Sequence, residues 1–151
     1  MTPRRLTHPS ASRLAISPSV TVAAPDHPLA SFKRRIPKAA LAKHVQLVLT
    51  DRSELSAGHD YGVKSAATWR LADLSTKHAF LRDSVGWGNM PEHMVSKDLA
   101  EGTLVTLDVE DMLPKGFSLA MAAFHRASEP PGPAGRWLID DLKVRFADQT
   151  Q

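Results

Sequence analysis

Residues 74–91 read Leu-Ser-Thr-Lys-His-Ala-Phe-Leu-Arg-Asp-Ser-Val-Gly-Trp-Gly-Asn-Met-Pro, and they hold the clearest structural pattern of the chain. At helical spacing, one face of a helix would carry Leu74, His78, Leu81 and Val85. Asp73 is the expected N-cap of this helix, and Gly86 is expected to end it. Residues 86–91 then predict a compact turn.

Apolar stretches on both sides of this helix predict β-strands. Residues 45–49 are almost entirely apolar, as in a strand that is buried on both faces. The other expected elements are strands over residues 19–24, 67–71, 103–107 and 119–124, a helical turn over 37–43, a short helix after Ser96 that closes at Gly102, and a helix over 135–146. Alternation of strands and helices predicts an α/β fold with helices on both faces of a sheet. Trp69 and Trp87 are expected in the core.

Composition narrows the class of protein. The chain has 151 residues, enough for one domain with its own core, and no cysteine, which excludes disulfide scaffolds and cysteine-based zinc sites. No apolar run approaches the length of a membrane-spanning helix. Residues 1–43 carry eight basic side chains and one acid, Asp26. We interpret residues 1–18 as a disordered basic tail and residues 147–151 as a short second tail.

Catalytic and metal-binding motifs do not emerge from the sequence. None of the seven histidines pairs with another at a spacing typical of a metal-binding helix. The glycines of Gly86-Trp87-Gly88 lack the third member of the dinucleotide fingerprint, and no Gly-x-Ser-x-Gly elbow or P-loop occurs. We therefore expect no metal, no cofactor and no enzymatic activity. For His78, the favoured interpretation is a partly buried histidine with its hydrogen bonds satisfied.

A ligand-binding cleft is the better-supported kind of site. In open α/β sheets, ligands bind beyond the carboxyl ends of the strands, against the amino termini of helices. Thr50-Asp51-Arg52-Ser53 follows one predicted strand, and Leu71 and Asp73 join another strand to a helix. Arg52 could bind a carboxylate through two hydrogen bonds. The alternatives are an ordinary strand-terminal turn for Thr50 to Ser53 and a simple helix cap for Asp73.

Several stretches together resemble one known family. They are Val22 to Ala30, the helix and Gly-x-Gly-x-x-Pro turn from Leu74 to Pro91, Leu99 to Val105, and an apolar strand before His125-Arg126 with a proline-rich break and a last helix. In order and spacing they resemble the effector-binding domain of LysR-type transcriptional regulators, over about residues 19–146. The candidate effector-binding residues are Thr50, Asp51, Arg52, Ser53, Leu71, Asp73, Gly86 and Trp87.

The resemblance implies a fold like that of the type 2 periplasmic binding proteins, with a mixed sheet flanked by helices. It implies that residues 31–118 supply most of the second lobe, and that residues 19–30 and 119–146 belong to an incomplete first lobe. The helix-turn-helix and the start of lobe one have no counterpart in the sequence. Apolar faces of residues 119–124 and of the last helix are therefore expected to lack partners.

Three hypotheses about function follow. The first is the effector-sensing part of a truncated LysR-type regulator, which is cytoplasmic and binds a small organic anion. The second is a free-standing ligand-binding module, or one that associates with a full-length regulator. The third is a small α/β enzyme, which no sequence motif supports. The resemblance implies a homo-oligomer or association with a full-length regulator, no direct contact of this fragment with DNA, and no membrane partner.

Overall fold

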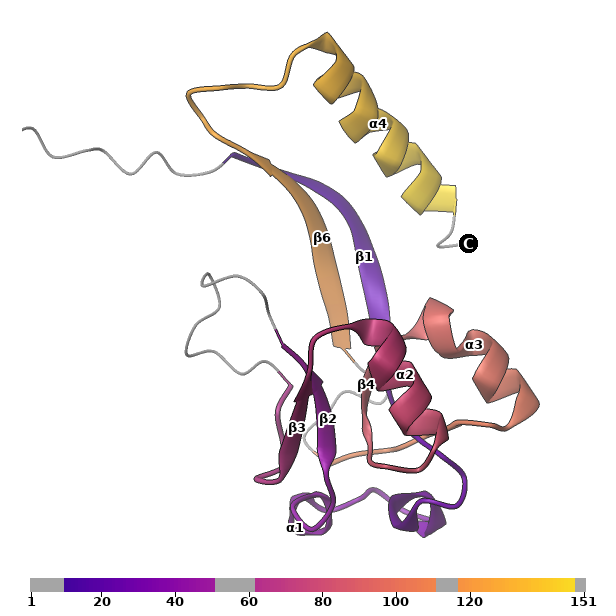
Figure 1. Ribbon diagram of the computed structural model, residues 1–151. Coiled ribbons are helices and arrows are strands. Elements are labelled where there is room, and N and C mark those ends of the chain that lie inside the picture. Colours follow the sequence, from indigo (N-terminus) through magenta and orange to yellow (C-terminus); the bar gives the residue numbers. More distant parts are fainter. Residues whose placement is uncertain (1–9, 51–61, 111–116, 149–151) are drawn as a thin grey trace, which may run out of the picture. The chain divides into compact units, whose positions relative to one another are not determined.

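The computed structural model describes residues 10–50, 62–110 and 117–148, which fall into two compact units (Figure 1). We call residues 18–117 the central unit, and residues 1–17 together with 118–151 the terminal unit. The boundary lies within one long strand, β1 (Ser10–Ala23).

A mixed sheet forms the centre of the central unit. After β1 its elements are the 3-10 helix η1 (Pro28–Ser31), α1 (Lys38–Leu41), β2 (Gln46–Leu49), β3 (Thr68–Leu71), α2 (Leu74–Arg82), β4 (Gly88–Pro91), α3 (Glu92–Glu101) and β5 (Val105–Thr106). Strands β2 and β3 pair in parallel, whereas β4 and β5 flank β1 in antiparallel pairing. A single parallel bridge between Gln46 and Trp87 joins β2 to the start of β4. This arrangement makes β3 an edge strand.

Two apolar clusters cover the two faces of this sheet. Side chains alternate between faces along a strand, so the neighbours Val22 and Ala23 enter different clusters. One cluster packs Ala23 and Trp87 against Leu29 of η1 and Leu41 of α1. The other packs Val22, Leu47 and Met90 against Leu81 of α2 and Val95 of α3. Helices thus cover both faces, which confirms the predicted α/β layering.

The carboxylate of Asp98, buried on α3, ties α3 to α2. Its Oδ2 lies 2.8 Å from His78 Nε2, and its Oδ1 lies 3.1 Å from Arg82 Nε. Thr103 Oγ1 donates a further hydrogen bond of 2.9 Å to Oδ1. Burial raises the pKa of Asp98, but the hydrogen bonds from Thr103 and His78 and the charges of His78 and Arg82 lower it more. The expectation that His78 is partly buried and hydrogen-bonded is confirmed.

Loss of this carboxylate should destabilise the central unit. We expect Asp98→Ala to lower the free energy of unfolding by about 2–3 kcal/mol, because it leaves His78, Arg82 and Thr103 without their shared acceptor. This expected loss of free energy is smaller than that for breaking a fully buried ion pair, because Arg82 is exposed. Urea denaturation measures the effect. Glu101→Ala, in the same helix, removes an exposed pair with Lys97 and is the control; equal losses in both variants would contradict the prediction.

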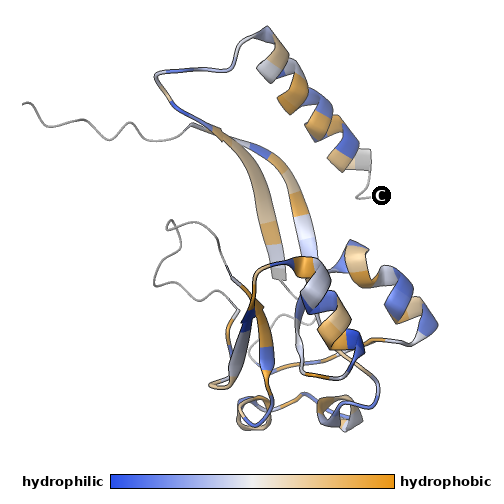
Figure 2. Ribbon diagram, viewed as in Figure 1, coloured by the Kyte–Doolittle hydropathy of each residue, from blue (hydrophilic) through white to orange (hydrophobic). Residues whose placement is uncertain are grey.

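The terminal unit has a different character. It contains the first part of β1, its partner strand β6 (Phe117–His125) and α4 (Pro133–Asp148). None of the side chains of residues 10–17 and 118–147 is buried. Large apolar side chains of β6 and α4 are exposed instead, among them Phe124 at 68% and Trp137 at 66%. Figure 2 shows hydrophobic residues along both β6 and α4. Within its described residues this unit therefore lacks a core of its own.

Several predicted elements need correction. Residues 10–18 are not a disordered tail, because β1 begins at Ser10 and is paired by β6. Residues 19–30 belong to the central unit, where Ala23 and Leu29 are buried beside Trp87, and their assignment to the first lobe stays a prediction. Residues 88–91 form β4, where a turn was expected. The last helix extends to Asp148, and residues 149–151 lie outside the described part of the chain.

Two more differences concern the helices. The helix that begins at Leu74 ends at Arg82, before Val85, and Ser84 then adopts a positive φ of 59°. Ser96 is not an N-cap, since α3 runs unbroken from Glu92 to Glu101. Gly102 closes α3 in the left-handed conformation at φ 74°, as predicted.

Candidate functional site

The carboxyl ends of β2 and β3 lie side by side, directly before the amino terminus of α2. Their parallel register continues one residue past β2, where the amide of Thr50 donates a hydrogen bond of 2.8 Å to Leu71 O. Thr50 is exposed and Leu71 is half-buried. Three residues after Leu71, α2 begins, and the amino terminus of a helix favours negative charge. The strands and α2 thus bring Thr50, Leu71 and Asp73 to one edge of the sheet.

Asp73 acts as the N-cap of α2. Its Oδ1 accepts a hydrogen bond of 2.7 Å from the Thr76 amide, and its Oδ2 accepts one of 2.7 Å from Thr76 Oγ1. Both carboxylate oxygens therefore serve the first turn of the helix. The cap interpretation explains this residue, and its expected role in effector binding stays a prediction.

Gly86 and Trp87 lie at the opposite end of β2. Trp87 is fully buried, its amide donates to Val45 O, and its carbonyl accepts from the Leu47 amide. A Cβ on Gly86 would lie 2.4 Å from Val45 O, so only glycine allows this close approach. These two residues do not meet Thr50 and Leu71 at one site. Asp51, Arg52 and Ser53 lie outside the described residues.

The two tryptophans behave differently. Trp87 packs in the core as predicted. The prediction for Trp69 is wrong: its side chain is 51% exposed and meets the ring of Phe80 at 6.4 Å between centroids. The physical reason is that, among the described strands, β3 pairs only with β2, so that Trp69 lies on an edge strand.

Lys77 is a notable residue that the sequence analysis missed. Its side chain is only 5% exposed, and Nζ donates a hydrogen bond of 2.7 Å to the backbone oxygen of Asn89. Burial lowers the pKa of its amine to about 8. The sequence signal was its position one turn before Leu81, on the apolar stripe of α2. Burying an ammonium group against a neutral carbonyl lowers the stability of the fold.

A buried amide network holds the segment before β3 in place. Gln46 Nε2 donates 2.7 Å to Gly62 O, and Gln46 Oε1 accepts from the amides of Lys64 and Ser65. Asn89 Nδ2 also reaches Gly62 O, at 3.4 Å, and its Oδ1 accepts from Thr21 Oγ1 at 2.7 Å.

Within the described residues no group of three or more His, Cys, Asp or Glu side chains could hold a metal ion.

With the geometry established, the comparisons with known proteins decide the family. The model of the LysR substrate binding domain matches residues 2–147. The chain belongs to the LysR substrate-binding domain family. Its regulatory domains are not enzymes, so the prediction of no enzymatic activity is confirmed. The match also begins well before residue 19, in agreement with the early start of β1. None of the described helices of this LysR domain is long and apolar enough to cross a membrane.

Solved structures of LysR regulatory domains share the fold. The CcmR regulatory domain of Synechocystis PCC6803, in complex with 2-PG, is 19% identical with a TM-score of 0.69, and the alignment covers 96% of this chain and 70% of that one. A MetR regulatory domain from N. meningitidis is 16% identical with a TM-score of 0.73, covering 97% and 69%. The QuiR effector-binding domain in complex with shikimate is 16% identical with a TM-score of 0.62, covering 99% and 69%. No curated protein sequence matches the chain.

These matches confirm the predicted fold class, a type 2 periplasmic-binding-protein-like arrangement. The chain spans about 70% of the length of these related domains.

Proposed function

We propose that this chain is the effector-sensing part of a LysR-family regulator, and that it binds a small organic anion at the carboxyl ends of β2 and β3. The observation that carries the proposal is the pairing of Thr50 with Leu71 directly before the amino terminus of α2. The positive end of the α2 dipole favours an anion at this edge, and Arg52 follows in sequence as a partner for a carboxylate. The relatives solved with 2-PG and with shikimate support a small-molecule ligand.

The remaining parts of the proposal follow from the family. We place residues 31–118 in the second lobe and residues 119–146 in the first. Ligand binding would shift the population of two states of a regulator assembly, in proportion to the ligand's difference in affinity for them. We assign the chain to the cytoplasm, and we assign DNA contact to regions of a regulator other than residues 19–146.

Thermal unfolding with a panel of small carboxylates tests the ligand proposal. A ligand at about a hundred times its dissociation constant should stabilise the native state by roughly 2.7 kcal/mol if it binds only that state. Arg52→Gln should abolish the shift, whereas Arg34→Gln, which removes an exposed arginine elsewhere, should preserve it. A shift that survives in Arg52→Gln would remove Arg52 from the site, and the absence of any shift across the panel would contradict effector binding.

A second candidate function is an association module, which the exposed apolar faces of the terminal unit favour. Leu119 and Met121 lie on one face of β6 and Phe124 on the other, and Trp137, Leu138 and Val144 are exposed on α4. We propose that a second copy of the chain covers these faces. Light scattering of the full chain should then give a dimer mass, and Phe124→Glu with Trp137→Glu should give a monomer. A wild-type monomer that is stable without a partner would contradict this.

A further inference from the structure

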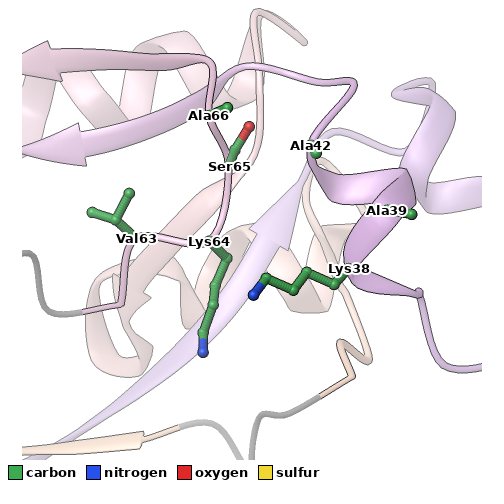
Figure 3. A pocket seen from close by; sticks show the side chains of 7 residues that line it. All are labelled: Lys38, Ala39, Ala42, Val63, Lys64, Ser65 and Ala66. Atoms are coloured by element: carbon green, nitrogen blue, oxygen red, sulfur yellow. The ribbon is translucent and has the colours of Figure 1, made fainter.

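A pocket in the central unit lies between α1 and the segment before β3. Its volume is about 780 Å³, and it is lined by Lys38, Ala39, Ala42, Val63, Lys64, Ser65 and Ala66 (Figure 3). The segment 63–66 leads into the amino end of β3, where the Gln46 amide donates to Ala67 O. The pocket therefore lies at the amino ends of β2 and β3, opposite the edge formed by Thr50 and Leu71.

Both walls of this pocket are held by buried groups. On one side, Gln46 Oε1 accepts hydrogen bonds of 2.7 Å and 3.0 Å from the amides of Lys64 and Ser65, and Ser65 Oγ donates to His44 O. On the other side, α1 is anchored by Leu41, which is fully buried in the core. A ligand would thus meet walls that are already in position, which reduces the entropy lost on binding.

The lining combines an apolar surface with two positive charges. Four of the lining residues are alanine or valine, and the side chain of Lys38 extends from α1 toward the segment of Lys64 (Figure 3). No ion pair joins either lysine to an acid of the described residues. Glu110 lies beside Lys38, where its Oε2 accepts a hydrogen bond of 3.4 Å from the Lys38 backbone amide. Asp108, close by in sequence, pairs with Arg35.

We propose that this pocket is a second anion site, which binds a small organic dianion with an apolar body between Lys38 and Lys64. The apolar walls accept the body of the ligand, and each ammonium accepts one negative charge. The site is independent of the proposed effector site, because it lies at the other end of the parallel strands. A ligand with two carboxylates and a phosphate monoester both satisfy this requirement for two negative charges.

Calorimetric titration of the full chain tests this site, with phthalate and phenyl phosphate as probes and benzoate as the singly charged control. We expect phthalate to bind at least about tenfold more tightly than benzoate. Lys38→Gln and Lys64→Gln should each weaken phthalate binding about tenfold, because each removes one charged hydrogen-bond donor. Lys33→Gln removes an exposed lysine outside the pocket and should leave the affinity within about twofold.

Two further variants sharpen the test. Glu110→Gln removes the nearby negative charge and should tighten phthalate binding about twofold to threefold. Ala42→Phe fills the pocket and should abolish binding, while the urea midpoint of this exposed position stays unchanged.

The outcomes separate the two sites. Phthalate affinity that is unchanged in Lys38→Gln and Lys64→Gln overturns the proposal, as does the absence of binding by either probe at millimolar concentration. If phthalate binding is lost in Arg52→Gln but kept in both lysine variants, the probe occupies the proposed effector site. The second site is then overturned and the proposed function stands.

Discussion

Replacing Trp87 by alanine should lower the free energy of unfolding by about 4 kcal/mol, the largest effect expected of a single substitution in this chain. The indole is fully buried among Ala23, Leu29 and Leu41, and its Nε1 donates to His44 O at 3.4 Å. Its removal leaves a cavity that the surrounding strands and helices cannot close without moving backbone. Urea denaturation followed by circular dichroism measures the loss without relying on the tryptophan signal.

Trp69→Ala is the matched control, because the residue type is the same and only the environment differs. Trp69 is half exposed on an edge strand, so we expect a loss of about 1 kcal/mol, mostly from its contact with Phe80. If Trp87→Ala does not fold, Trp87→Phe provides a graded measurement, with an expected loss of about 2 kcal/mol. Equal losses at positions 69 and 87 would contradict the placement of Trp87 in the core.

Lys77→Met should change the pH dependence of stability. The pKa of the Lys77 amine is about 8 in the folded chain against an ordinary value of 10.5. Between these pH values the unfolded chain binds more protons, so the stability of the natural chain rises with pH across this range. Below about pH 8 the cost of burying the ammonium is fully present. The advantage of Lys77→Met should therefore shrink by roughly 3 kcal/mol from pH 8 to pH 10.5.

Urea denaturation of both proteins over this pH range measures the difference. At pH 7.5 we expect Lys77→Met to be more stable by roughly 2 kcal/mol, because methionine gives up the hydrogen bond to Asn89 O but removes the buried charge. Lys97→Met removes an exposed lysine from α3 and controls for the loss of one lysine. Stability curves that run parallel for the natural chain and Lys77→Met would contradict the burial of a charged amine.

Local patterns predicted those features that depend on neighbours in sequence. The N-cap at Asp73, the glycine that closes α3 and the strands over residues 46–49 and 68–71 were all expected. The strand β4 was missed because its sequence, Gly-Asn-Met-Pro, has the composition of a turn, and its pairing with β1 comes from residues far away in the chain. Of the candidate site residues, Thr50, Leu71 and Asp73 lie at one edge of the sheet and Gly86 and Trp87 lie at the opposite end of β2, and their role in effector binding stays a prediction.

The α/β class and the order of most elements could be predicted from periodicity and caps along the chain, and the resemblance to LysR effector-binding domains rests on the quoted stretches of sequence. The tertiary structure alone decided which tryptophan is buried, that Lys77 turns inward to Asn89 O, and that Lys38 and Lys64 line one pocket. The physical reason is that burial depends on where a strand or helix lies in the sheet. An edge strand and an inner strand can carry the same apolar pattern, and only the neighbouring strands distinguish them.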